Sequence, residues 1–338
     1  MSARDPIRAI ADAVLYEGYI LWPYRRSAMK NHQRWTFGGV YPRDHSEGRE
    51  DDPWVMQTQV LVKGSDDATL SVGVRFLHIV QRDVARFTDG DLEPIDELVL
   101  GDERHLSWEE AVEREIQTPD LRLGDLNSGH SVPIEVEAAS TEEKLLDAEG
   151  MQAGAIVRSW EGLKGSVEVG AERLEDELHR VTVRIENTTP WPGGLRGEAQ
   201  KRTFCSTHTV LRIEGGAFVS LTDPPEELRD EAQACQNEQT WPVFVGEAES
   251  RNTMLSSPII LEDHPQIAPE SPGDLFDGGE IDQMLVLNIL SLTDDEKAEM
   301  RDSDPRAREI LERTEALTEE EKMSLHGTIR EFGMARSR

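Results

Sequence analysis

Hydrophobic and polar residues alternate through much of the middle of this chain, which is the pattern of half-buried β-strands. The clearest example is residues 178–187, LHRVTVRIEN, where apolar side chains mostly alternate with polar neighbours. Further strands are predicted at residues 55–62, 69–80, 133–139, 155–160, 166–174, 204–213, 216–221 and 255–261. Short strands joined by turn-rich loops favour an antiparallel β-sandwich or barrel over a parallel α/β sheet.

Two loops punctuate this pattern. Gly64-Ser65-Asp66-Asp67 lies between the predicted strands 55–62 and 69–80, and its composition predicts a hairpin that joins them. The loop at residues 188–194, TTPWPGG, ends the strand at 178–187 because its Pro and Gly residues cannot continue a β-ladder.

Helical spacing is found near the N-terminus and once inside the β-patterned region. Residues 7–14 place Ile, Ala and Val on one side of a short amphipathic helix. Residues 107–116 are also predicted to be helical, because Ser107 and Glu110 have the spacing of a capping box ahead of an apolar face.

The pattern becomes helical again at the C-terminal end. An apolar stretch covers residues 284–292. Capping-box pairs at Thr293/Glu296 and Thr318/Glu321, and the cap Asp304 before Pro305, mark three helix starts. They predict helices at residues 294–302, 305–316 and 319–332. The expected fold class is therefore mainly β, or α+β overall, with a short N-terminal helix and a helical C-terminal region.

Composition divides the chain into four parts. Residues 1–50 hold the N-terminal helix and a basic, aromatic segment, and residues 51–262 form a β-rich domain. Residues 263–280 are rich in Pro, Gly and acid and are predicted to be a linker. Residues 281–338 form the helical C-terminal region.

The chain is strongly acidic, with 67 Asp and Glu residues against 36 Lys and Arg and a net charge of −31. Many carboxylates and few lysines are typical of halophilic proteins, where salt screens the self-repulsion, although ordinary acidic bacterial proteins share this balance. A field of this sign repels phosphate, so no nucleic-acid partner is expected.

Several other classes of protein are not expected either. No apolar run approaches the roughly 20 residues that cross a bilayer, and the N-terminus lacks a signal-peptide core. Two cysteines cannot build a disulfide framework. We expect a cytoplasmic protein without membrane insertion.

The basic aromatic segment, residues 16–43, is the strongest candidate for recognition. It contains all four tyrosines, and from Tyr19 to Arg43 it carries five cationic side chains and no carboxylate. Arginines bind anionic groups and stack on aromatic rings, and Arg, Tyr and Trp dominate binding hot spots. The predicted partner- or anion-binding residues are Arg25, Arg26, Lys30, Asn31, Arg34 and Trp35. A structural alternative is that the aromatic rings fill the core while the cations pair with the chain's own carboxylates.

Metal and catalytic motifs are weak. Cys205 and His208, with Cys235, could supply soft ligands for zinc, but the spacing lacks a second pair. A three-residue offset in a strand also sends the side chains of Cys205 and His208 to opposite faces. The glycines form no phosphate-binding loop, and His130 lies in a turn. We expect no metal site, no catalytic residue and no cofactor.

Two segments resemble a known group of proteins. Residues 15–42, LYEGYILWPYRRSAMKNHQRWTFGGVYP, look like the opening of uncharacterised proteins encoded in actinobacterial-type [NiFe]-hydrogenase gene clusters. Residues 304–313, DPRAREILER, are similar to the C-terminal part of the same proteins. The resemblance implies an accessory or assembly role near a hydrogenase. It does not imply nickel binding, because the chain lacks the paired CxxC motifs of the hydrogenase large subunit.

The function expected from the sequence is therefore that of a non-catalytic accessory factor for an oxidoreductase complex, which binds hydrogenase subunits or maturation factors. The alternative is a protein or enzyme that binds a small anionic ligand with the arginine cluster. A metal carrier that uses Cys205, His208 and Cys235 is a third possibility.

Overall fold

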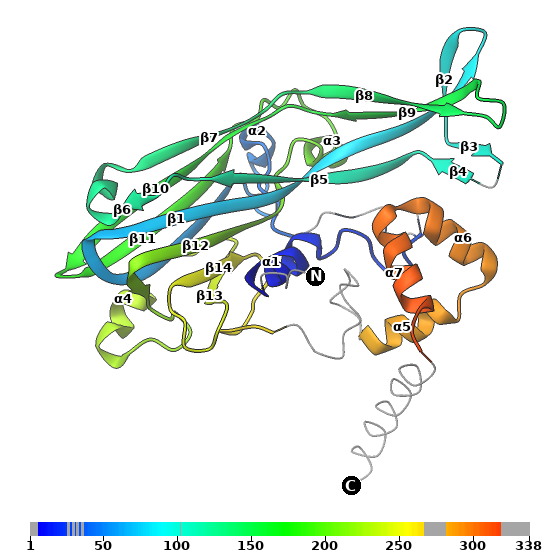
Figure 1. Cartoon of the computed structure of the whole chain (residues 1–338). Coiled ribbons are helices and arrows are strands. Elements are labelled where there is room, and N and C mark those ends of the chain that lie inside the picture. The colour runs from blue at the N-terminus through cyan, green and yellow to red at the C-terminus, as the bar shows by residue number, and fades with distance from the viewer. Residues whose placement is uncertain are drawn as a thin grey trace.

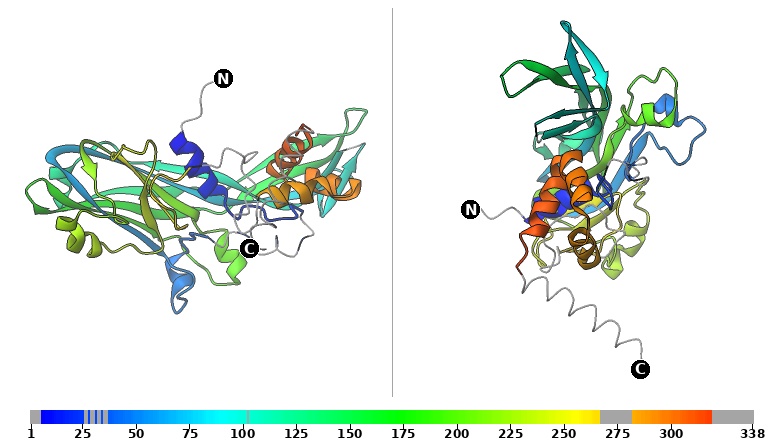
Figure 2. Two further views of the ribbon diagram at one scale, coloured as in Figure 1. Left: turned by 90° about the horizontal axis from the view of Figure 1, so that it is seen from below. Right: turned by 90° about the vertical axis from the view of Figure 1, so that its right-hand side faces the viewer.

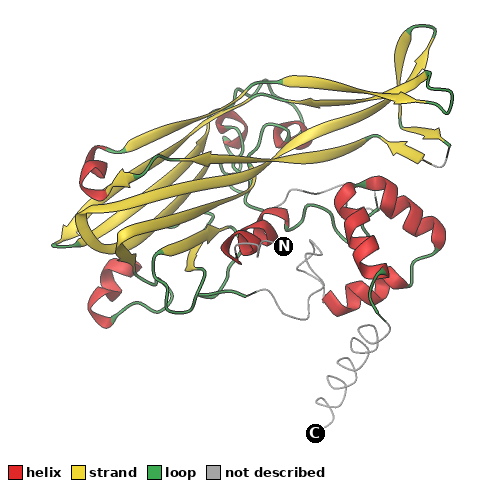
Figure 3. Ribbon diagram, viewed as in Figure 1, coloured by secondary structure: helices red, strands yellow, loops and turns green. Residues whose placement is uncertain are grey.

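A computed structural model describes residues 6–25, 28, 31, 34, 37–101, 103–266 and 282–318 of the chain. Most of these residues form antiparallel strands of one 12-stranded sheet, and helices lie at both ends of the chain (Figure 1 and Figure 3). The predicted fold class, mainly β with a short N-terminal helix and C-terminal helices, is confirmed. Within the described part of the chain, no helix has the length and apolar character needed to span a membrane.

The strands are β1 (Val55–Thr88), β2 (Asp91–Ile95), β3 (Glu97–Leu100), β4 (Glu103–Leu106), β5 (Trp108–Gln117), β6 (Leu121–Arg122), β7 (His130–Val136), β8 (Ala139–Leu146), β9 (Gln152–Trp160), β10 (Leu163–Glu175), β11 (Leu178–Asn187), β12 (Cys205–Phe218), β13 (Trp241–Phe244) and β14 (Thr253–Ser257). The helices are α1 (Pro6–Tyr16), α2 (Arg43–Ser46), α3 (Arg196–Gln200), α4 (Arg229–Gln233), α5 (Asp282–Leu290), α6 (Asp294–Ser303) and α7 (Pro305–Glu315), with short 3-10 helices η2 (Leu123–Ser128) and η3 (Glu226–Leu228).

Strand β1 is the centre of the sheet, whose main path runs β13-β14-β12-β1-β11-β10-β7. The hairpin predicted at residues 64–67 is wrong, because β1 continues through it. Both sides of this stretch pair antiparallel with β12, through Val62 with Phe218 and Thr69 with Glu214. The Gly and Asp residues form a bulge with a shifted register instead of a turn.

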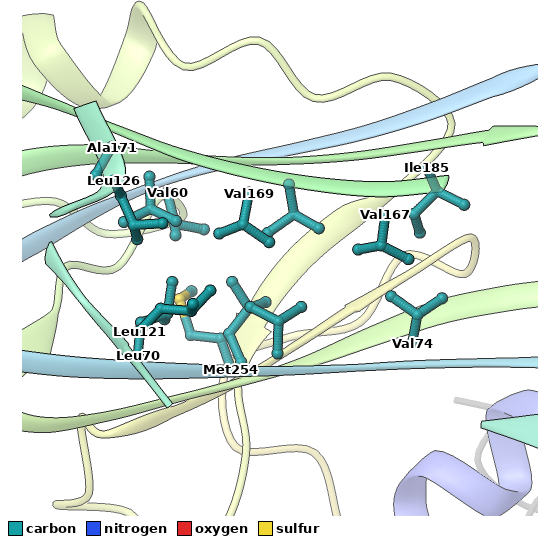
Figure 4. Close-up of a cluster of buried hydrophobic side chains, with 14 of the residues drawn as sticks. Val60, Leu70, Val74, Leu121, Leu126, Val167, Val169, Ala171, Ile185 and Met254 are labelled. Atoms are coloured by element: carbon teal, nitrogen blue, oxygen red, sulfur yellow. The ribbon is translucent and has the colours of Figure 1, made fainter. Parts of the chain in front are cut away.

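The hydrophobic core lies between two parts of this sheet. Figure 4 shows Val167 of β10 and Ile185 of β11 across the core from Val74 of β1. Fully buried aromatic residues strengthen the same core, because Phe76 and Phe204 have ring centroids only 4.7 Å apart. The sheet thus folds over on itself, which gives the sandwich arrangement that the alternating strands predicted.

The helix predicted at residues 107–116 is also wrong, because these residues form β5. Ser107 does not cap a helix: its hydroxyl donates to the Ile95 carbonyl and accepts from the Val84 amide. The glutamates of β5 face arginines of β1, and Arg75 and Arg82 form ion pairs with Glu113 and Glu110 at 2.8 and 2.7 Å. Pairing with β1 therefore overrides the local helical spacing.

The N-terminal helix is confirmed, since Ile10, Ala11 and Val14 of α1 pack on Val210 of β12 and Leu255 of β14. The predicted strands at 133–139, 155–160, 166–174 and 178–187 are found as β7, β9, β10 and β11. The strands predicted at 204–213 and 216–221 are one strand, β12, and the strand predicted at 255–261 is the shorter β14.

Two of the three predicted C-terminal helices are found as α6 and α7. Thr293 and Glu296 form the expected reciprocal capping box, and Asp304 accepts a hydrogen bond from the Arg306 amide ahead of Pro305. The third predicted helix, at 319–332, and most of the predicted linker lie outside the described residues. The division into four parts remains a prediction.

Candidate functional site

The described part of the basic aromatic segment packs between the sheet and the C-terminal helices. Three of its tyrosines, Tyr16, Tyr19 and Tyr24, are buried in one hydrophobic cluster. The same cluster contains Leu77 and Ile79 of β1, and its helical members are Leu285, Val286, Ile289, Met300, Ala307, Ile310 and Leu311. Both views in Figure 2 place α6 and α7 close to the sheet. The segment therefore acts as the packing layer that joins α5, α6 and α7 to β1.

Asn31 fixes the shape of this segment. Its side chain is buried, and its Oδ1 accepts a hydrogen bond of 2.8 Å from the Leu21 amide. Its Nδ2 donates to the carbonyl oxygens of Leu21 and Arg25, at 2.9 and 3.0 Å. The polar atoms of the Asn31 side chain therefore all have hydrogen-bond partners in the same chain. Through these bonds Asn31 holds the loop that begins at Leu21 in a closed shape.

Arg34 is an interior side chain, with only 3% of it exposed. Its guanidinium donates to the carbonyl oxygens of Tyr19 (3.3 Å) and Glu109 (2.7 Å) and lies 3.9 Å from the centroid of the Trp108 ring. Burial lowers its pKa from the ordinary value for arginine. The Trp108 ring covers one face of the guanidinium group, and the hydrogen bonds from its edge tie the N-terminal segment to β5.

Arg25 is half-buried and reaches helix α6. Its Nη1 lies 3.0 Å from Glu296 Oε1 and 4.0 Å from Glu299 Oε2. The arginine therefore meets carboxylates of its own chain, as the structural alternative predicted for this segment. Of the six predicted binding residues, Arg26, Lys30 and Trp35 lie outside the described residues, and the binding role of the set stays a prediction.

The two segments that carry the resemblance contact each other directly. The Tyr19 hydroxyl donates a buried hydrogen bond of 2.7 Å to Asp304 Oδ2, and the Arg306 guanidinium lies 3.4 Å from the Tyr16 ring centroid. Burial and the Asp304 carboxylate raise the pKa of Tyr19, so its phenol remains a donor at neutral pH. The sequence identified Asp304 as a helix cap but gave no signal that Tyr19 was its partner.

Replacing Asp304 by Ala is expected to lower the free energy of unfolding by about 2–4 kcal/mol. The variant loses the cap of α7, which contributes about 1 kcal/mol, and leaves the buried Tyr19 hydroxyl without an acceptor, which costs about 1–3 kcal/mol. Asp304→Asn is the matched control, because an amide oxygen can serve as both cap and acceptor. Urea unfolding followed by tryptophan fluorescence measures both. Equal losses in the two variants would contradict this account.

A cleft of about 920 Å³ opens beside Arg34, between the sheet and α6. Its described lining is Asn31, Arg34, Gln81, Asp83, Val84, Pro94, Ile95, Asp96, Glu97, Arg104, Leu106, Ser107, Trp108, Glu109 and Glu299. Carboxylates outnumber arginines in this lining, and both Arg34 and Arg104 are paired with groups of the chain. The charge of the cleft therefore favours a cationic over an anionic ligand.

The cysteines and histidines singled out from the sequence are not gathered into one site. Burial raises the pKa of the Cys205 thiol to about 12 and lowers the pKa of His208 to about 3, so both are neutral at neutral pH. Cys235 follows α4 and contacts the Glu231 carbonyl, while His130 begins β7. The described residues contain no group of three His, Cys, Asp or Glu side chains suited to a metal ion.

Comparison with known proteins adds no relative: no protein-family model, no curated protein and no solved structure matches this chain. The function is therefore inferred from the residues of the chain and their contacts.

Proposed function

We propose that this chain is a non-catalytic accessory protein of an oxidoreductase complex and that it acts in [NiFe]-hydrogenase assembly. One observation carries the proposal. Residues 15–42 and 304–313, which carry the resemblance, come from opposite ends of the chain but pack into one unit through Tyr19, Asp304, Tyr16 and Arg306.

This packing gives the resemblance a structural meaning. If the two similarities were unrelated, nothing would require residues 15–42 and 304–313 to be in contact. If the two segments form one structural unit, the side chains on both sides of their contact must remain complementary. Asn31 and Arg34 stabilise the unit from inside. The proposal assigns contact with the partner to Arg26, Lys30 and Trp35, the remaining cationic and aromatic residues of the predicted set.

Affinity purification from a host that expresses a hydrogenase of this type tests the proposal. We expect the tagged chain to recover hydrogenase subunits or maturation factors, and Arg26→Glu with Lys30→Glu to reduce that recovery about tenfold by charge repulsion. The matched control is Lys63→Glu with Arg122→Glu, which reverses two exposed cations of the sheet outside the basic aromatic segment. Circular dichroism checks that all variants remain folded.

A deletion strain supplies the second readout. If the chain is an assembly factor, the strain accumulates immature hydrogenase with reduced activity, and the wild-type gene restores it. Full hydrogenase activity without the chain, or recovery of no hydrogenase component above an untagged control, overturns the proposal.

A further inference from the structure

One end of the sheet extends beyond the core as a distal blade, built from the end of β1 with β2, β8 and β9, and the separate two-stranded sheet of β3 and β4 packs against it (Figure 1). Large apolar side chains are exposed on it: Phe87 is 37% exposed, Leu146 55% and Met151 67%. Phe87 lies near the end of β1, and the other two flank the turn between β8 and β9. Exposed apolar residues that gather in one place mark interaction sites more often than scattered ones do.

Strand register brings these residues together. Leu145 and Arg86 both pair with Gly154, so β8, β9 and β1 lie side by side at this level. Phe87 and Leu146 therefore lie two strand spacings apart, which is about 10 Å. That separation suits a short apolar segment of a partner.

Alternation places Phe87 and Leu146 on the same face. Val84 and Leu145 point to the opposite face, where they pack with Leu98 of β3. Phe87 is three residues from Val84, and Leu146 follows Leu145, so both have the opposite orientation. The hairpin of β3 and β4 thus covers one face of the blade, and Phe87 and Leu146 are exposed on the other face.

The blade is held in shape by close packing. An added Cβ at Gly154 would lie only 2.4 Å from the Ala85 carbonyl oxygen and from Leu98 Cδ2. Leu98 therefore rests directly on the backbone of β9. A surface fixed in this way loses little conformational entropy when a partner binds.

The charge around the apolar patch selects the partner. Residues 83–106 and 139–156 together contain 12 carboxylates and three Lys or Arg residues. Exposed carboxylates at Asp89, Asp91 and Glu93 flank Phe87, and the exposed Glu149 and half-buried Asp147 lie between Leu146 and Met151. We propose that the blade docks a partner protein through a basic segment with apolar residues at its centre. A second copy of this chain is disfavoured as the occupant, because its blade has the same charge.

This inference rests on residues other than those of the proposed function, and it is tested with a defined probe. The probe is a fluorescein-labelled 14-residue peptide of Leu, Lys and Arg, compared with a peptide in which Glu replaces every cation and with one in which Ser replaces every Leu. We expect fluorescence anisotropy to give a dissociation constant of about 1–100 μM for the basic apolar peptide alone. Leu146→Ser with Met151→Ser should weaken its binding about tenfold.

The matched control is Val112→Ser with Leu195→Ser, because these apolar residues are exposed outside the blade. Support requires that this control bind like wild type and that hydrogen exchange show peptide-induced protection in residues 84–92 and 145–153. Equal binding by wild type and the blade variant would reveal non-specific attraction to an acidic chain and overturn the proposal. So would no saturable binding, or a wild-type dimer that the blade variant converts to monomer, since a second copy would then be the occupant.

Discussion

The protein is expected to lose about 4 kcal/mol of unfolding free energy between pH 7 and pH 5 because of two buried histidines. Burial, with a smaller effect of nearby arginines, lowers the pKa of His78 to about 4 and of His208 to about 3. Their ordinary value is 6.5, so in this window the unfolded chain binds protons that the folded chain excludes. Their contribution is complete above pH 6.5 and falls as the pH drops, by about 2 kcal/mol for each histidine at pH 5.

The measurement compares wild type with a variant that carries His78→Leu and His208→Leu. Acidification also relieves repulsion among the carboxylates, which raises the free energy of unfolding. This effect is the same in both proteins, so it cancels in the comparison. Asp52 and Asp263 do not interfere. Burial is the largest single effect and raises the pKa of each, but the hydrogen bonds and nearby positive charges together hold both below the ordinary 3.8, outside the window. Urea unfolding at pH 7, 6 and 5 gives the slope of the unfolding free energy against pH for each protein.

The variant should show a much flatter pH dependence than wild type. Parallel curves for wild type and the double variant would show that the two histidines titrate alike in the folded and unfolded chain. All points lie above the isoelectric point of about 4.6, so the chain keeps its negative charge.

The sequence correctly predicted the elements that depend on interactions between residues close together in the chain. The alternation at residues 178–187 matches the buried and half-buried pattern of β11, and the capping residues Thr293 and Asp304 mark the starts of α6 and α7. Each of these signals depends on neighbours within a few residues. Tertiary contacts reinforce the same choice, so local and global preferences agree.

Long-range pairing decides the elements that the sequence predicted incorrectly. Residues 107–116 have helical spacing, but Glu110 and Glu113 find their partners on Arg82 and Arg75 of β1. Gly64 and its polar neighbours have turn composition, yet β12 pairs with β1 on both sides of them, so they form a bulge within the strand instead of a hairpin turn. The pairing partners lie tens of residues away along the chain, so a local pattern of residues cannot reveal them.

The candidate site shows the same division. The composition of residues 16–43 correctly marked an unusual segment, and the structure accounts for Arg25, Asn31 and Arg34 by contacts with their own chain. Those contacts involve Glu109 and Glu296, far along the sequence. The excess of carboxylates in the sequence predicts that the arginines form ion pairs within the chain. It does not identify the carboxylate that pairs with each arginine.

Replacing Arg34 by Glu is expected to destabilise the fold by about 3–5 kcal/mol, because it places an uncompensated carboxylate in the buried position of a cation that is hydrogen-bonded there. The new carboxylate would face Glu109, whose Oε2 lies 4.0 Å from Arg34 Nη2, and the carbonyl oxygens of Tyr19 and Glu109 would lose their donor. Stacking on Trp108 would disappear as well.

Arg34→Lys is the control that separates charge from geometry. Lysine keeps the charge but cannot donate in two directions while it stacks on Trp108, so we expect a loss of about 1–2 kcal/mol. Urea unfolding measures both variants, and faster hydrogen exchange in α7 reports release of the C-terminal helices. If Arg34→Glu instead leaves unfolding within about 0.5 kcal/mol of wild type, as surface substitutions do, and abolishes recovery of a partner, Arg34 is a docking residue and its interior role is wrong. The two roles therefore predict opposite results for one substitution.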